Sequence, residues 1–226
     1  MESIRQNFID EDRWKYLFDG LMTTLLITLF AVLIGLALGF LVAIIRSTHL
    51  KTGKLTILDF FCKIYLAVIR GTPVVVQLLI TYFVIFGSVD ISKVLVAILA
   101  FGINSGAYVA EIVRGGIMSI DNGQFEAGRS LGLNYRQTMQ RIIMPQALKT
   151  VLPALANEAI VLLKETSVAG YIAIADLTKG GDIIRSQTFS PFLPLISVAL
   201  IYLVIVLFLT HMTGKLERRL AANDRR

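Results

Sequence analysis

The chain contains an uncharged run of 26 residues, Gly20 to Ile45, and a second uncharged run of 20 residues, Pro191 to Thr210. A helix needs about 20 apolar residues to cross roughly 30 Å of hydrocarbon, so each run is long enough by itself. Only 17% of the residues are charged, against about 25% in a typical soluble domain. We therefore predict an all-α polytopic membrane protein.

Apolar runs predict five membrane crossings. They are Gly20 to Ile45, about Ile64 to Gly87, about Val94 to Ala110, about Ala147 to Leu163, and Pro191 to Thr210. The second is interrupted by Arg70-Gly71-Thr72-Pro73, and the fourth is short and polar. A polar span needs surrounding helices or a wet cavity. Residues 20–213 are the predicted transmembrane domain, between an extracytoplasmic tail (1–19) and a cytoplasmic tail (214–226).

The distribution of basic residues predicts the orientation. Fourteen Lys and Arg residues fall in the first and third loops and the C-terminal tail, against seven on the other side. The positive-inside rule then places the C-terminus in the cytoplasm and the N-terminus outside, in agreement with an odd number of crossings. The same rule explains the net charge of +6, so no nucleic-acid partner is expected. Acidic residues precede the first run, which is also too long for a typical signal-peptide core.

Cofactor and metal chemistry find little support in the sequence. Cys62 is the one cysteine, and His49 and His211 lie far apart, as interfacial or cytoplasmic side chains. The phosphate-binding pattern G-x-x-x-x-G-K-[ST] is absent. We expect no metal site and no cofactor in this chain, and ATP hydrolysis would require a separate subunit.

The largest predicted cytoplasmic segment, about residues 121–146, reads DNGQFEAGRSLGLNYRQTMQRIIMPQ. Asp121 or Asn122 is suited to cap a helix that Gly132 would end. Gly128 and Gly132, four residues apart, leave one helix face bare for close approach to another surface. A second helix is predicted from Tyr135 to Ile143, with Pro145 breaking the run into the fourth span.

This segment resembles the EAA loop of ATP-binding-cassette importer permeases. That pattern is Glu-Ala-Ala, three residues, Gly, nine residues, then Ile-x-Leu-Pro. The matching residues, at the same spacing, are Glu126-Ala127-Gly128, Gly132 and Ile142-Ile143-Met144-Pro145. The departures, Gly128 for Ala and Met144 for Leu, are mild in volume.

Other stretches resemble the polar-amino-acid uptake branch of that family, and the resemblance runs from about Gly20 to Leu216. They are Arg70-Gly71-Thr72-Pro73 with Gln77, Gly106-Ala107-Tyr108, Ala110-Glu111-Ile112, Arg114-Gly115-Gly116-Ile117, Pro145-Gln146-Ala147 and Lys164-Glu165-Thr166-Ser167.

The resemblance implies a bacterial inner-membrane permease with a type I importer fold. Its EAA helix would dock on an ATPase subunit through Glu126, Ala127, Gly128, Leu131 and Gly132. Further implied partners are a second permease copy (identical or a close paralogue), an extracytoplasmic solute-binding protein, an amino-acid substrate and the lipid bilayer. Read without the resemblance, the segment is an ordinary amphipathic helix on the membrane surface.

Polar side chains inside the predicted spans are candidates for the solute path. They are Glu158, Asn157, Asn104, Tyr108 and Gln77. A mid-membrane carboxylate is costly unless paired or hydrated, so Glu158 either holds a cationic amino acid, pairs with Arg70 or Lys164, or is protonated. Asn104 and Tyr108 lie on one helix face and either line a cavity or bond across helices. Gln77 follows the break at Pro73, which either exposes carbonyls to a solute or only kinks the helix.

Two local ion pairs are also predicted, Glu111 with Arg114 and Asp59 with Lys63, together with a re-entrant or external gate segment from Thr166 to Asp176.

Two other classes of protein compete with an importer subunit. An intramembrane serine protease would need a G-x-S-G serine and a mid-membrane histidine, and Gly102-Ile103-Asn104-Ser105-Gly106 misses that pattern by one residue. A secondary transporter or channel would use Glu158 but leave the EAA spacing unexplained.

Overall fold

The computed structural model describes residues 2–223, with side chains as far as Leu220, and these residues form helices and turns without strands. The α-helices are α1 (Glu2–Ile4), α2 (Trp14–Thr52), α3 (Thr56–Gly71), α4 (Val74–Ile80), α5 (Lys93–Met118), α6 (Asn122–Ser130), α7 (Tyr135–Thr138), α8 (Met144–Glu165), α9 (Leu177–Thr188) and α10 (Phe192–Asn223). Short 3-10 or π-helical turns occupy Arg5–Ile9, Asp10–Asp12, Thr81–Ile85, Met139–Ile143 and Thr166–Ile172.

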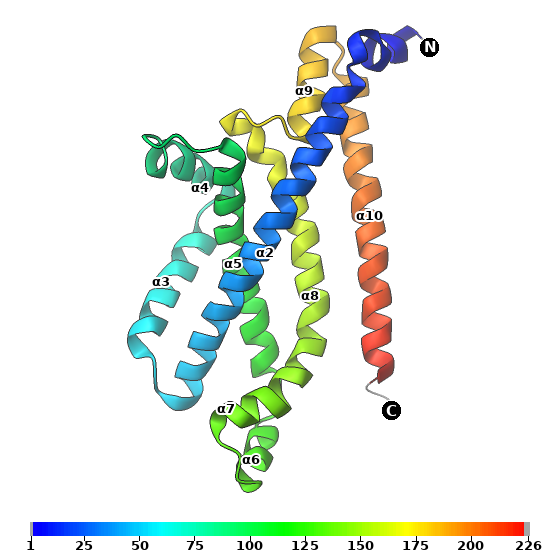
Figure 1. Ribbon diagram of the computed structural model, residues 1–226. Coiled ribbons are helices and arrows are strands. Elements are labelled where there is room, and N and C mark those ends of the chain that lie inside the picture. Colours follow the sequence, from blue (N-terminus) through cyan, green and yellow to red (C-terminus); the bar gives the residue numbers. More distant parts are fainter. Residues whose placement is uncertain (1, 224–226) are drawn as a thin grey trace.

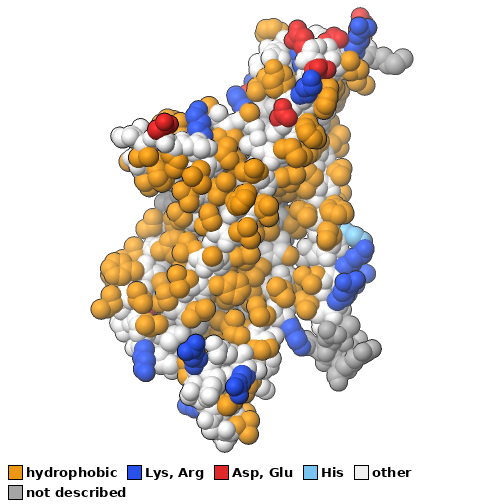
Figure 2. Space-filling model, in the orientation of Figure 1, with side chains coloured by type: hydrophobic (Ala, Val, Ile, Leu, Met, Phe, Trp, Pro, Cys, Tyr) orange, Lys and Arg blue, Asp and Glu red, His pale blue; other side chains and the backbone are white. Residues whose placement is uncertain are grey.

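Four helical segments are long and apolar enough to cross a membrane: α2, α5, the segment Tyr135–Ile172 that contains α8, and the α10 segment Phe192–Leu220. The second predicted span corresponds to a bent pair of helices, Thr56–Gly71 and Val74–Ile85, with an angle of 110° between its halves. α2, α5, α8 and α10 run along the long axis, with α9 at one end and α6 and α7 at the other (Figure 1). Apolar side chains cover the middle of the visible face and charges gather at its ends (Figure 2).

The central pair, α2 and α5, packs closely because small residues face each other along it. A Cβ atom on Gly35 would lie 3.0 Å from Cβ of Ser105, and one on Gly102 would lie 2.8 Å from Cβ of Ile34. Such small residues let spanning helices approach backbone to backbone. α5 is consequently the most enclosed span: 72% of the residues in its apolar 18-residue stretch are buried.

The break in the second span falls where the sequence predicts it. Thr72 is extended, with φ −126° and ψ 149°, as steric contact with the Pro73 ring requires of the preceding residue. Pro73 then caps α4 with its own extended backbone. The halves of this span therefore point in different directions, and its helix is interrupted at Thr72 and Pro73, which are both exposed.

The end of the bundle where α2 begins also holds α9, a helix that lies within a predicted loop (Figure 1). Asp176 accepts hydrogen bonds from the backbone N–H groups of Thr178 (3.2 Å) and Lys179 (3.1 Å) and so caps α9. The Leu177 N–H donates to Oγ1 of Thr24 on α2, at 3.1 Å. The predicted gate segment forms the turn Thr166–Ile172 and the four residues that lead into α9.

Several predicted boundaries differ from the structure. α2 begins inside the predicted N-terminal tail, and α10 continues into the predicted C-terminal tail, whose last three residues lie outside the described part. The predicted break at Pro145 is wrong. Pro145 lies in the first turn of α8, where the backbone N–H that proline lacks has no partner within that helix. The π-helical turn Met139–Ile143 leads directly into α8.

Candidate functional site

Helix α6 lies beyond the ends of the spans, next to α7 (Figure 1). The side chain of Asp121 accepts a hydrogen bond from the Gly123 N–H at 2.6 Å, which confirms the predicted cap. Gly132, with φ +76°, follows the last turn, and its N–H donates to the Arg129 carbonyl at 2.9 Å. The two ends predicted from the sequence are therefore the two ends observed, within two residues.

Phe125 fastens α6 to the bundle. Its side chain is 8% exposed and stacks on the Tyr135 ring, with centroids 6.4 Å apart. The Lys51 ammonium at the end of α2 lies 4.6 Å from the Phe125 ring centroid and donates to Oδ1 of Asn122 at 2.7 Å. α6 is thus in contact with α2 and α7 through packed side chains.

The five predicted coupling residues divide into two groups. Glu126, Ala127, Leu131 and Gly132 are exposed, with Leu131 75% exposed. Gly128 is buried, because a Cβ atom there would lie 2.6 Å from Cγ2 of Thr138. The bare face created by Gly128 therefore receives α7 of the same chain, and the change from alanine is not mild in this setting.

Gln77 and Asn104 bond to each other. Nδ2 of Asn104, which is 2% exposed, donates to Oε1 of Gln77 at 2.9 Å. Nε2 of Gln77 donates to the Ile69 carbonyl at 2.7 Å and to Oγ1 of Thr72 at 2.8 Å. Of the alternatives for Gln77 and Asn104, these contacts favour bonding across the break over exposure to a solute.

Glu158 lies on α8, half-buried, facing α5. Oγ of Ser105 donates a hydrogen bond to its Oε1 at 2.9 Å. Among the described residues, neither Arg70 nor Lys164 lies within ion-pair distance of Glu158, and Arg70 instead faces Glu111 at 3.8 Å. The structure therefore leaves two alternatives for this carboxyl group, a ligand role or protonation.

The remaining two candidates lie elsewhere. Asn157 is exposed and lines a groove of about 440 Å³ between α8 and α10, with Pro153 and Thr210. Tyr108 lines a cavity of about 530 Å³ between α3 and α5, where the guanidinium carbon of Arg70 lies 5.9 Å from its ring centroid. The predicted solute-path residues are thus distributed over separate places in this single chain.

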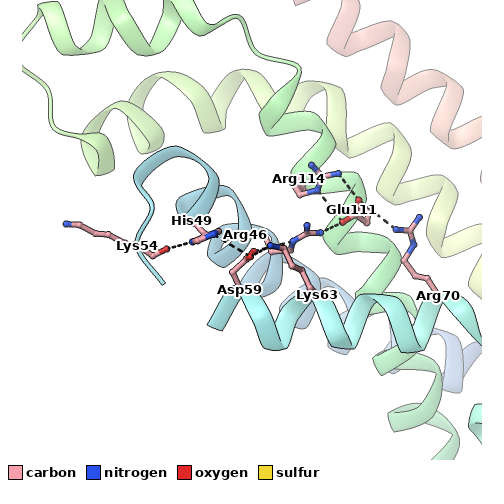
Figure 3. A network of polar contacts seen from close by, with 8 residues as sticks. All are labelled: Arg46, His49, Lys54, Asp59, Lys63, Arg70, Glu111 and Arg114. Atoms are coloured by element: carbon pink, nitrogen blue, oxygen red, sulfur yellow. Dashed lines mark hydrogen bonds and ion pairs between the residues drawn. The ribbon is translucent and has the colours of Figure 1, made fainter. Parts of the chain in front are cut away.

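A network of charged groups joins the Arg46 end of α2, the length of α3 and the Arg114 end of α5 (Figure 3). Both predicted pairs are present: Arg114 donates to Glu111 at 2.8 Å, and the Lys63 ammonium lies 2.7 Å from Asp59. Arg46 joins them, since its Nη1 donates to Glu111 at 2.7 Å and its Nε lies 3.5 Å from Asp59. Arg46 falls in a predicted loop, directly after the uncharged run that ends at Ile45, and this position marks it as interfacial.

A multi-span bundle with a short capped helix held beyond its end defines an integral membrane subunit built to contact another protein. The chain belongs to the family described as the binding-protein-dependent transport system inner membrane component, which its residues 35–222 match. The family recognition made on the EAA spacing is confirmed, and this family consists of multi-pass transport subunits rather than enzymes.

Similar proteins carry more specific names. The chain is 37% identical over 211 residues to the arginine transport system permease protein ArtQ of Bacillus subtilis, covering 92% of this chain and 94% of that one. It is 34% identical over 210 residues to a putative glutamine transport system permease protein, GlnP, of Rickettsia typhi, again covering 92% and 94%.

Two solved structures have the same fold. The crystal structure of an amino acid ABC transporter with histidines matches with a TM-score of 0.83 and 42% identity, covering 91% of this chain and 94% of that chain. An inward-facing methionine ABC transporter, MetNI, matches with a TM-score of 0.78 at 18% identity, which concerns the fold alone, and covers 93% and 98%.

Proposed function

We propose that this chain is the permease subunit of an ATP-driven importer for polar or basic amino acids, with arginine, lysine or histidine favoured. The observation that carries the proposal is α6, a capped helix fastened to the spans by Phe125 and exposing Glu126, Ala127 and Leu131 beyond them. A partner that changes shape on ATP hydrolysis can move such a rigid helix, and the helix moves the spans.

The proposed assembly contains two permease copies, identical or closely paralogous, because five spans are few for a complete pore. Each copy docks one ATPase, and an extracytoplasmic binding protein delivers the solute. The N-terminus lies outside and the C-terminus in the cytoplasm, which agrees with α6 and the end of α10 lying at one end of the bundle and α2 beginning at the other (Figure 1).

The solute class rests on Glu158 and on the relatives. The Glu158 carboxyl group is half-buried, accepts a hydrogen bond from Ser105 and has no ion pair among the described residues. Its charge is therefore available to an ammonium or guanidinium group. One similar protein is named for arginine, another for glutamine and a third for L-cystine. Alternating access would then bring the solute past Glu158.

The decisive experiment is reconstitution of the chain in proteoliposomes with and without the co-expressed ATPase, screened against a panel of amino acids. Uptake that requires both ATP and the ATPase, with arginine, lysine or histidine preferred, supports the proposal. A Leu131→Cys variant should form a cross-link to the ATPase, and a Lys93→Cys variant at the opposite end should not. Uptake that persists without any ATPase would identify a secondary transporter instead.

A further inference from the structure

The cavity between α3 and α5, about 530 Å³, has an excess of positive charge. Four of its lining residues are cationic, Arg46, Lys63, Arg70 and Arg114, and one, Glu111, is anionic. Asp59 stands behind this lining and is 2% exposed. Counting both carboxylates, two positive charges remain without a counter-charge in the network.

The charge excess is greatest at the open side of the cavity. Glu111 accepts hydrogen bonds from Arg46 (2.7 Å) and Arg114 (2.8 Å), while Arg70 lies farther away, at 3.8 Å. The Arg70 side chain is 45% exposed and the Lys63 side chain 56% exposed. These two cations therefore keep donors free for a further anion.

Lys63 and Arg70 lie two turns apart on one face of α3, about 10 Å along its axis. The neighbouring face of the same helix is apolar and exposed. Its residues are Ile57, Phe60, Phe61, Ile64 and Val68. A ligand that fits both faces carries an anionic group beside an apolar chain.

Depth in the membrane points the same way. The α2 residue Arg46 lies just over one turn before Lys51, which bonds α6 outside the spans. The Arg46 end of the cavity is thus near the level of the headgroups, and on the cytoplasmic side if the proposed orientation holds. Basic pockets between spans on that side suit anionic lipid headgroups.

From this geometry we propose that the cavity binds the phosphate group of an anionic phospholipid of the inner leaflet, whose acyl chains lie along the apolar face of α3. Lys63 and Arg70 contact the phosphate, and the ion pairs of Arg46, Glu111 and Arg114 hold the cavity open. The site does not overlap Glu158 and needs no transported solute.

The test uses the full chain together with the subunits of its complex. The complex is purified in mixed micelles that contain phosphatidylglycerol and phosphatidylcholine. Native mass spectrometry then counts the retained lipid. Wild type should retain phosphatidylglycerol in preference to phosphatidylcholine. Arg70→Gln should weaken retention about fivefold, the effect of one basic residue near a membrane surface. Lys54→Gln removes a charge at the same end outside the cavity and should have no effect.

Arg70→Lys keeps the charge and should restore most of the retention, which separates loss of charge from misfolding. Equal retention by wild type and Arg70→Gln would overturn the proposal. Displacement of the lipid by low-millimolar inorganic phosphate would overturn it in favour of a free anion. Because the readout is lipid retention, its failure is distinguishable from a failure of amino-acid transport.

Discussion

Asn104 on α5 donates a hydrogen bond of 2.9 Å to Gln77 on α4, one turn after the break in the second span. Gln77 in turn donates to the Ile69 carbonyl on the other half of that span. The buried Asn104 and the partly buried Gln77 therefore connect both halves of a broken span to the most enclosed helix of the bundle.

Replacing Gln77 by Leu is expected to destabilise the protein by about 1–3 kcal/mol, because Asn104 stays buried without its partner. The double variant Gln77→Leu/Asn104→Leu should be more stable than the sum of the single effects predicts, since it removes both polar groups together. Thermal unfolding in lipid nanodiscs measures both quantities. Strictly additive effects would contradict a direct coupling.

Glu158→Ala is expected to weaken the stimulation of ATPase activity by a basic amino acid. A hydrogen-bonded charge is worth about 1.5–3 kcal/mol, so the half-stimulating concentration should rise about tenfold or more. Ser105→Ala keeps the carboxylate and should change that concentration much less. If the Glu158 variant responds as wild type does, the carboxylate is not a ligand.

Gly128→Ala is expected to loosen the coupling segment, because the new Cβ atom would lie 2.6 Å from Cγ2 of Thr138. Overpacking of this kind costs about 1–3 kcal/mol. Thr138→Ala in the same chain removes the clashing atoms and should recover stability and ATPase stimulation together. Failure of this second change to recover either would mean that Gly128 acts through another contact.

Leu131→Ala tests docking without disturbing the fold. The side chain is 75% exposed, so the midpoint of thermal unfolding should stay unchanged. Affinity for the ATPase should fall, because the proposed docking surface loses an exposed apolar side chain. Binding measured with purified subunits checks this, and unchanged affinity would remove Leu131 from the docking surface.

Burial raises the pKa of the Asp176 carboxyl above its ordinary value of 3.8, although two backbone N–H groups oppose the shift. A raised pKa means that the contribution of this group to stability is present in full below pH 3.8 and is lost as the pH rises through the raised value. Asp176→Asn keeps a capping oxygen without a charge.

Asp176→Asn should therefore be at least as stable as wild type at neutral pH. The difference in unfolding free energy between the two proteins should narrow as the pH falls. Asp176→Ala should cost about 1 kcal/mol through the lost cap of α9. Unfolding curves of the three proteins between neutral and acidic pH measure this. A wild-type to Asn difference independent of pH would show that the carboxyl does not titrate differently in the fold.

The sequence by itself determined the spans, the break in the second span and the capped helix α6, because each depends on short-range physics. An uncharged run of 26 residues has no other low-energy place than a bilayer. Thr72 before Pro73 is restricted to extended backbone, whatever surrounds it. Asp121 and Gly132 end a helix through bonds to neighbours a few residues away.

Only the tertiary structure decided which polar residues share a site. Asn157 and Glu158 are adjacent in sequence, yet one lines the groove toward α10 and the other bonds Ser105 on α5, since successive residues of a helix point about 100° apart. Arg46 reaches Glu111, 65 positions away, and Gly128 meets Thr138 rather than a partner. Such contacts depend on helix packing, which no local pattern specifies.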